Sequence, residues 1–179
     1  WYIYTLGGIP IPTSIDGSDP ILMLRDDNHD HGFTYAKKFD TILDGQSTIH
    51  AKIMIKDEEL DPMNQAPEFR FYIQQDSADL GDSDADVEQT GENTATTFGN
   101  IVTLQFTKND IIFNGKNTIS KYYEDTWYDI RLLMDADRGT CNLYINDSLV
   151  GKDLEYSDSA TSNNIARWQI SSRLAGTQD

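Results

Sequence analysis

The residues best suited to ligand chemistry are cations, amides and aromatic rings that recur at every second position of short apolar segments. Arginine and lysine bind carboxylates through charge-assisted hydrogen bonds, and arginine can form two in parallel. Aromatic rings stack on the apolar faces of pyranose rings. The candidates with these properties are His50, Lys52, Arg70, Tyr72, Gln74, Trp127, Arg131 and Tyr144. Together they predict a surface that binds a polymer of sugar rings.

Several cations fall on the polar side of the predicted strands. They are Lys52, Arg70, Arg131, Arg167 and Arg173, in a chain with 14 lysines and arginines. If most of them share one sheet, they form a cationic groove on an otherwise acidic protein. Such a groove would suit a polymer of uronic acids, because arginine pairs with carboxylates. The alternative is that they are ordinary solvated residues divided between two sheets.

The sequence does not indicate catalysis by paired carboxylates. Glycoside hydrolysis needs two acids close together, which on a strand means alternate positions. The nearest such spacing, in residues 84–88, lies in an acidic segment without strand character, and we interpret it as solvated or metal-binding.

A polysaccharide lyase is the more serious alternative. It would neutralise a uronate and abstract a proton, and suitable residue types occur at His50, Arg70, Tyr72, Gln74 and Tyr144. The same side chains serve plain binding, so binding without reaction is the preferred interpretation.

A cluster of acids near the start of the chain suggests a calcium site. Calcium takes six to eight oxygen ligands, and Asp26, Asp27 and Asp30 lie together in a polar segment. The alternative is a polar turn that binds no metal. The single cysteine, Cys141, lies in a predicted strand, and we interpret it as a small apolar filler.

The elements that must position these residues are strands. Short or alternating apolar runs recur between clusters of Gly, Asp, Asn, Ser and Thr, which is typical of a sandwich or barrel. The predicted strands are residues 21–24, 33–39, 48–55, 69–74, 101–106, 111–113, 127–134, 141–145 and 165–170, with an additional edge strand at 1–5. Residues 75–99 are predicted to form a long acidic loop, or a loop that carries one short strand, between two of them.

Within the strands, apolar and polar side chains alternate. Successive side chains of a strand point to opposite faces. Phe71, Ile130 and Leu143 are therefore predicted in the layer between two sheets, and the candidate binding residues are predicted on the outer faces.

The composition indicates one folded domain of 179 residues with a net charge of −16. That charge disfavours nucleic acid and anionic membrane surfaces as partners. No apolar run approaches the ~18 residues that cross a bilayer. We expect a single sandwich domain over residues 1–179 that belongs to a larger secreted protein.

Two neighbouring segments carry a family resemblance. In residues 123–135, a strand starts with Trp127-Tyr128 after a polar loop and ends in Asp135. The chain then turns through Gly139-Thr140 and returns as Tyr-Ile-Asn-Asp, residues 144–147. This pattern resembles the late hairpin of concanavalin A-like and laminin G-like jelly rolls, and residues 21–27, 33–39 and 49–53 match the same layout.

The resemblance implies an all-β fold, a two-sheet antiparallel β-sandwich of the jelly-roll kind. Such domains are similar to the carbohydrate-binding modules appended to bacterial polysaccharide lyases and glycoside hydrolases, and related modules often hold a structural calcium. We therefore expect an extracellular, monomeric module that tethers a parent enzyme to a polysaccharide. Acidic, pectin-like glycans are the favoured ligands. A small jelly-roll lyase and a laminin G-like protein-adhesion domain remain as alternatives.

Overall fold

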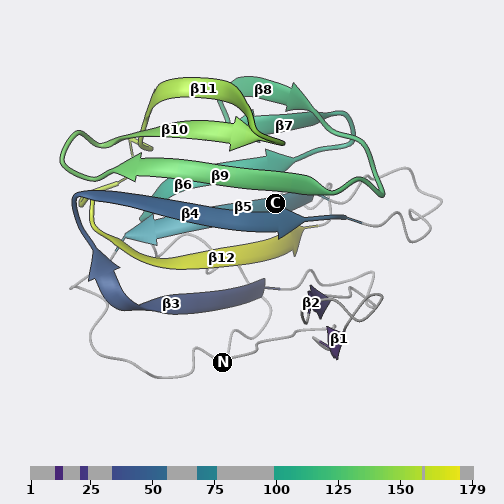
Figure 1. Ribbon diagram of the computed structural model, residues 1–179, viewed down its shortest axis with the longest axis horizontal. Coiled ribbons are helices and arrows are strands. Elements are labelled where there is room, and N and C mark those ends of the chain that lie inside the picture. Colours follow the sequence, from purple (N-terminus) through teal and green to yellow (C-terminus); the bar gives the residue numbers. More distant parts are fainter. Residues whose placement is uncertain are drawn as a thin grey trace, which may run out of the picture.

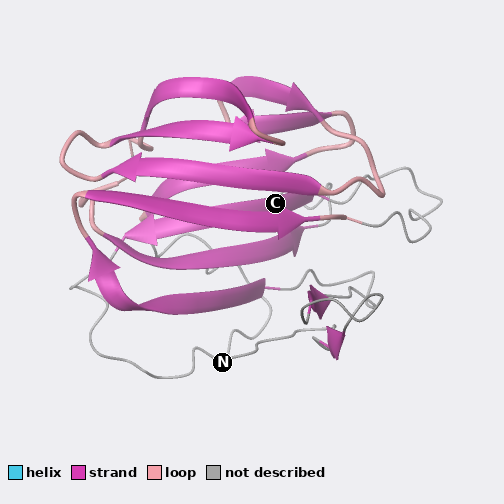
Figure 2. Ribbon diagram, viewed as in Figure 1, coloured by secondary structure: helices cyan, strands magenta, loops and turns pink. Residues whose placement is uncertain are grey.

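The structure is a computed structural model that describes residues 11–13, 21–23, 34–55, 68–75, 99–158 and 160–173. All regular elements among these residues are strands (Figure 2). Their bounds are β1 Ile11–Thr13, β2 Ile21–Met23, β3 Thr34–Leu43, β4 Gln46–Ile53, β5 Glu68–Gln75, β6 Asn100–Phe106, β7 Asp110–Phe113, β8 Asn117–Lys121, β9 Tyr128–Asp135, β10 Thr140–Ile145, β11 Ser148–Glu155 and β12 Ile165–Arg173.

Two antiparallel sheets make up the body of the molecule. One has four strands in the order β11-β10-β9-β4, and the other has six in the order β3-β12-β5-β6-β7-β8. The four-stranded sheet lies in front of β5 and β6 in Figure 1. β1 and β2 form a separate two-stranded ribbon. The predicted all-β sandwich is thus confirmed. Among the described residues, there is no helix long and apolar enough to span a membrane.

The core lies between the two sheets and follows the predicted alternation. Ile49 on β4 pairs with Leu132 on β9, and Leu132 pairs in turn with Leu143 on β10. All three are buried in one cluster with Phe71 and Ile73 of the six-stranded sheet. The alternation in these strands therefore correctly indicates which side chains are buried.

Cys141 belongs to the same core. It is a free cysteine, and burial raises the pKa of its thiol to about 12. A thiol in this state is a poor nucleophile near neutral pH. The interpretation of Cys141 as an apolar filler agrees with this position.

The chain crosses from one sheet to the other between β3 and β4. β3 is an outer strand of the six-stranded sheet and β4 an outer strand of the four-stranded sheet. Gly45, at φ +63, occupies the connection and adopts a backbone conformation that favours glycine. His50 and Lys52, on β4, therefore belong to the sheet opposite that of β3.

Three strands differ from the sequence prediction. β1, β8 and β11 were not predicted, because β1 has three residues and the other two are mostly polar or exposed. β8 and β11 lie at the ends of their sheets, where one edge needs no apolar partner. The predicted strand at residues 1–5 lies outside the described residues.

The predicted loop of residues 75–99 is described only at its two ends. Gln75 is the last residue of β5, and its backbone N–H donates to the carbonyl of Gly99 over 3.0 Å. The two ends of this segment are therefore joined, and residues 76–98 lie outside the described part.

Replacement of Leu132 by Ala tests the core. Leu132 is fully buried at the centre of the four-stranded sheet, so Leu132→Ala is expected to lower the free energy of unfolding by about 2–5 kcal/mol. The matched control is Leu133→Ala, because Leu133 is the next residue on the same strand and faces outward, half-buried. Its expected cost is about 1 kcal/mol or less. Equal costs in denaturant unfolding would contradict the assignment of faces.

Candidate functional site

The core separates the predicted binding residues into two groups. Arg70, Tyr72 and Gln74 lie on β5 of the six-stranded sheet. The other group is on the four-stranded sheet or just before β9, and it contains His50, Lys52, Trp127, Arg131 and Tyr144. The eight residues therefore do not line one groove.

The predicted cations are divided in the same way. Lys52 and Arg131 belong to the four-stranded sheet, whereas Arg70, Arg167 and Arg173 belong to β5 and β12 of the six-stranded sheet. Three of the five thus share the six-stranded sheet and two lie on the other, and no groove collects all five, because alternation specifies a face of a strand but not the sheet that the strand joins.

The outer face of the six-stranded sheet is closed at its centre. Gln74, Tyr72 and Gln169 are all buried there. Arg167 Nε donates to Gln74 Oε1 over 2.6 Å, and Gln74 Nε2 donates to Asn100 Oδ1 over 2.9 Å. Burial lowers the pKa of Arg167 to about 10. Gln74 is thus bonded on both of its amide atoms, and its buried side chain is not available to a ligand at the surface.

A second buried amide fixes the segment before β12. Gln75 Oε1 accepts hydrogen bonds from the backbone N–H groups of Thr161 and Ser162, each over 2.8 Å. Gln75 Nε2 donates to Thr161 Oγ1 over 2.7 Å. A side chain at Gly99 would collide with Gln75 at 2.4 Å. Gln75 is therefore a structural residue, and its neighbour Gln74 belongs to the same closed layer.

The outer face of the four-stranded sheet is open and collects the other group. His50 on β4 pairs with Arg131 on β9, and Arg131 pairs with Tyr144 on β10. Lys52 and Asp129 pair in the next row of the same face. Because neighbouring strands lie about 4.8 Å apart, the three side chains of the first row fall within about 10 Å.

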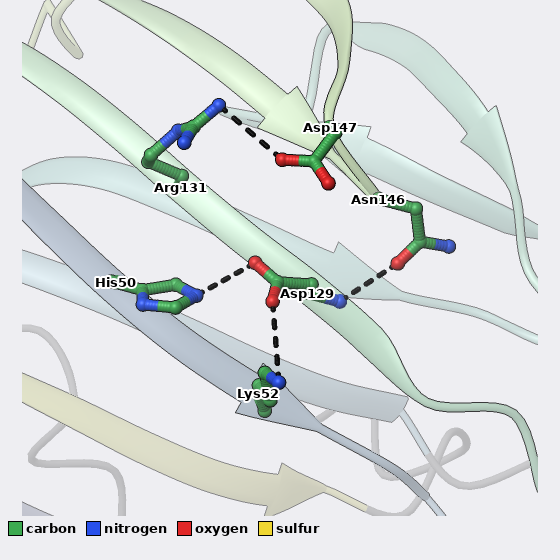
Figure 3. A network of polar contacts seen from close by, with 6 residues as sticks. All are labelled: His50, Lys52, Asp129, Arg131, Asn146 and Asp147. Atoms are coloured by element: carbon green, nitrogen blue, oxygen red, sulfur yellow. Dashed lines mark hydrogen bonds and ion pairs between the residues drawn. The ribbon is translucent and has the colours of Figure 1, made fainter.

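Asp129 organises one half of this open face (Figure 3). Its Oδ1 lies 2.7 Å from His50 Nε2, and its Oδ2 lies 3.6 Å from Lys52 Nζ. The carboxylate can only accept, so Nε2 carries the shared proton. The hydrogen bond from His50 is the main reason that the pKa of Asp129 lies below its usual value of 3.8. Asp129 therefore stays charged and holds His50 in a fixed orientation.

Arg131 organises the other half. Its guanidinium carbon lies 4.8 Å from the centre of the Tyr144 ring, which is a cation–π contact. Arg131 Nη2 lies 3.6 Å from Asp147 Oδ1, in the turn between β10 and β11 (Figure 3). The neighbouring turn residue Asn146 accepts a hydrogen bond from the Asp129 backbone N–H over 2.9 Å. The turn is thus attached to the face at two points.

Trp127 adds an exposed ring close to this network. It is 44% exposed and lies directly before the first residue of β9, two residues before Asp129. Leu149, which pairs with Tyr144, is also exposed and extends the row onto β11. The face therefore combines apolar surface with oriented donors and acceptors.

The open face is balanced in charge. Lys52 lies within ion-pair distance of Asp129, and Arg131 within ion-pair distance of Asp147. Sequence reasoning missed both aspartates and Asn146, although each had a visible signal. Asp129 alternates with Arg131 in the strand, and Asn146-Asp147 marks the turn that follows β10. The missing information was the pairing of strands that brings Asp129 to His50 and Lys52, and the turn to Asp129 and Arg131.

The residues that would serve a lyase are divided between the two sheets. His50 and Tyr144 are on the open face with the strand of Arg131 between them. Tyr72 and Gln74 are buried on the outer face of the other sheet, and Arg70 is on the same strand as these two. His50 and Tyr144 therefore cannot act together with Tyr72 or Gln74 on one sugar, and Tyr72 and Gln74, which do share a face of β5, are both buried.

A hollow lies elsewhere on the surface. It has a volume of about 230 Å³ and is lined by the hairpin of β7 and β8 and by β11 with the segment after it, among them Asn114, Lys116 and Asp158. None of the predicted binding residues lines it. The hollow is therefore separate from the open face of the four-stranded sheet.

The predicted calcium ligands Asp26, Asp27 and Asp30 lie outside the described residues, so the calcium site stays a prediction. Within the described part of the chain, no three His, Cys, Asp or Glu side chains are grouped so that they could hold a metal ion.

Comparisons with known proteins give two weak structural matches. No protein-family model and no curated protein matches the chain. A solved sialidase has a TM-score of 0.37 and 12% identity, over 89% of this chain and 13% of the sialidase. The carbohydrate recognition domain of Emp46p, solved as a point mutant, has a TM-score of 0.45 and 10% identity, over 79% of this chain and 70% of that one. Similarity at this level says nothing about a ligand of this chain.

The contact between His50 and Asp129 predicts a pH-dependent stability. The pKa of Asp129 is lowered in the folded protein, so its stabilising contribution is present above the usual carboxyl pKa and is lost as the pH falls through the lowered value. Asp129→Asn is therefore expected to unfold at lower temperature than the parent at neutral pH. The difference should shrink at pH values well below 3.8, because both proteins then carry a neutral group.

Thermal unfolding over a pH series checks this expectation. Asp137→Asn is the matched control, since Asp137 is an exposed aspartate in the turn before β10. Its melting temperature should follow the parent at every pH. A destabilisation by Asp129→Asn that is the same in acid and at neutral pH would contradict the role of the charge.

Proposed function

We propose that this chain is a non-catalytic carbohydrate-binding module that holds a parent enzyme on a polysaccharide. The binding surface is the outer face of the four-stranded sheet. The observation that supports this most strongly is the stack of the Arg131 guanidinium on the Tyr144 ring, 4.8 Å from its centre, with the exposed indole of Trp127 just before the same strand as Arg131. Sugars are bound by such combinations of flat apolar surface and fixed polar groups.

The polar half of the site suits hydroxyl groups. Asp129 orients His50, and Lys52 lies beside them with its ammonium largely exposed. Charge-assisted hydrogen bonds to a ligand are stronger than neutral ones. Because Asp129 is already held by His50 and by the turn, a ligand meets these groups with little further loss of side-chain freedom.

The shape of the face suits a chain more than a single small molecule. The row of His50, Arg131 and Tyr144 crosses three strands, and Leu149 continues it onto a fourth. A polymer lying along such a row can make several weak contacts at once. Tethering of this kind raises the local concentration of an attached enzyme at its substrate.

Acidic, uronate-containing glycans of the pectin type are the proposed ligand class. The protein as a whole carries a net charge of −16 and repels polyanions. Binding of such a polymer therefore requires local cations, and Arg131 and Lys52 provide them on the open face. An extracellular location, a structural calcium and a monomeric state within a larger bacterial enzyme belong to the same proposal.

Affinity electrophoresis of the purified chain in gels that contain single polysaccharides tests the function. Retardation by a uronate-containing polymer is expected, and Trp127→Ala should weaken it by about tenfold or more, which corresponds to 1.4 kcal/mol. The loss is expected because the indole no longer covers a sugar ring. Circular dichroism of the variant checks that the fold is retained.

An arginine pair provides a second prediction with a matched control. Arg131→Ala is expected to weaken binding, because it removes both the guanidinium and its stack on Tyr144. Arg138→Ala removes an exposed arginine that is also 3.6 Å from an aspartate, Asp153, but lies in the turn before β10. It should bind like the parent. Equal losses in both variants would indicate a general charge effect and would contradict the proposed face.

The two alternatives have their own signatures. If the chain releases unsaturated uronate from a polymer, detected by ultraviolet absorbance, the protein is a lyase and not a non-catalytic binding module. Absence of retardation by every polysaccharide in a broad panel would overturn carbohydrate binding and favour an adhesion domain with a protein partner.

A further inference from the structure

We infer that Asp147 occupies the position of a ligand carboxylate on Arg131, and that a uronate of the glycan displaces it on binding. The inference rests on the proposed function and adds a residue that determines specificity at the same face. Asp147 then acts as an internal competitor that selects anionic sugars over neutral ones.

The two aspartates of the face are held very differently. Asp129 is 36% exposed and lies 2.7 Å from His50 Nε2, within hydrogen-bond range. Asp147 is 91% exposed and lies 3.6 Å from Arg131 Nη2, beyond the range of a charge-assisted hydrogen bond. Exposed ion pairs of this kind contribute little to stability. A ligand carboxylate can therefore replace Asp147 on Arg131, whereas Asp129 remains in place.

The turn itself does not require an aspartate at this position. Ile145 pairs with Ser148, so Asn146 and Asp147 are the two central residues of the hairpin. Both have positive φ, at 49° and 61°, which is the pattern of a type I′ turn. Glycine is strongly favoured at the second position of such a turn. Asparagine and aspartate are also accepted in such turns, so the turn tolerates Asp147 without needing its carboxylate, which is left to approach Arg131.

Arg131 is prepared to receive a carboxylate. Its guanidinium is held against the Tyr144 ring, which limits its rotation and leaves its edge as a donor. A planar guanidinium can bind a carboxylate through two parallel hydrogen bonds. The single 3.6 Å approach of Asp147 does not use this geometry. A uronate would gain the second bond that Asp147 lacks.

Two forms of one polymer test the inference: homogalacturonan with free carboxylates, and the same polymer fully methyl-esterified. Asp147→Asn keeps a residue that tolerates positive φ and removes the competing charge. It is expected to raise affinity for the free-acid form about two- to fivefold at low ionic strength, the range set by exposed ion pairs. Affinity for the ester should not change. At about 1 M salt, where the screening length is about 3 Å, the gain should vanish.

Asp153→Asn is the matched control. Asp153 lies on β11, also has a positive φ, and approaches Arg138 to the same 3.6 Å. This variant removes one negative charge from the protein as a whole, so it measures the general electrostatic effect. The inference requires a larger gain from Asp147→Asn than from Asp153→Asn. It also requires that the extra gain disappears when Arg131 is replaced by Ala in a double-mutant cycle.

Each outcome has a distinct meaning. A gain in Asp147→Asn no larger than in Asp153→Asn, or an equal gain on both polymer forms, overturns the inference and leaves carbohydrate binding intact if the parent binds. If neither the parent nor Asp147→Asn is retarded by either form or by any other polysaccharide of the panel, the proposed function fails and the inference fails with it.

Discussion

The exclusion of water from the layer between the two sheets is the constraint on which the other features depend. Leu132 lies at the centre of that layer, between Ile49 and Leu143. Because a strand alternates strictly between two faces, burial of these residues forces their neighbours His50 and Arg131 to the outside. A shift of one residue in the register of β4 would exchange the two sets. The open face is therefore specified by apolar residues that never contact a ligand.

Charge on the open face is arranged locally against the charge of the whole protein. Acidic residues outnumber basic ones by 30 to 14, yet Lys52, Arg131 and His50 gather on adjacent strands. Asp129 and Asp147 balance them, with one aspartate tightly bonded and the other exposed. Such a surface needs no ligand to balance its charge, because a carboxylate lies near each of the two cations Lys52 and Arg131 and offsets the repulsion between them.

The sequence predicts the faces of the strands but not the sheets they join. The alternation in β5 correctly places Phe71 and Ile73 inside, opposite Tyr72 and Gln74. Which strands become neighbours depends on long-range pairing, and local pattern carries no information about it. Tyr72 and Gln74 were therefore assigned to a shared surface, whereas they lie in a closed layer behind the core. Polar strands such as β8 escaped prediction because one edge of such a strand needs no apolar partner.

The separation of pairing partners along the chain has a consequence for how the protein folds. His50 and Asp129 are 79 positions apart, and Gln74 and Arg167 are 93 apart. Closing such long loops lowers the chain entropy before the stabilising contacts form. Domains of this topology therefore typically fold in milliseconds to seconds. The hairpin of β9 and β10 can bring Arg131 onto Tyr144 early, since its strands are adjacent in sequence. The contact of His50 with Asp129 forms only when β4 docks, so the complete face exists only in fully folded molecules.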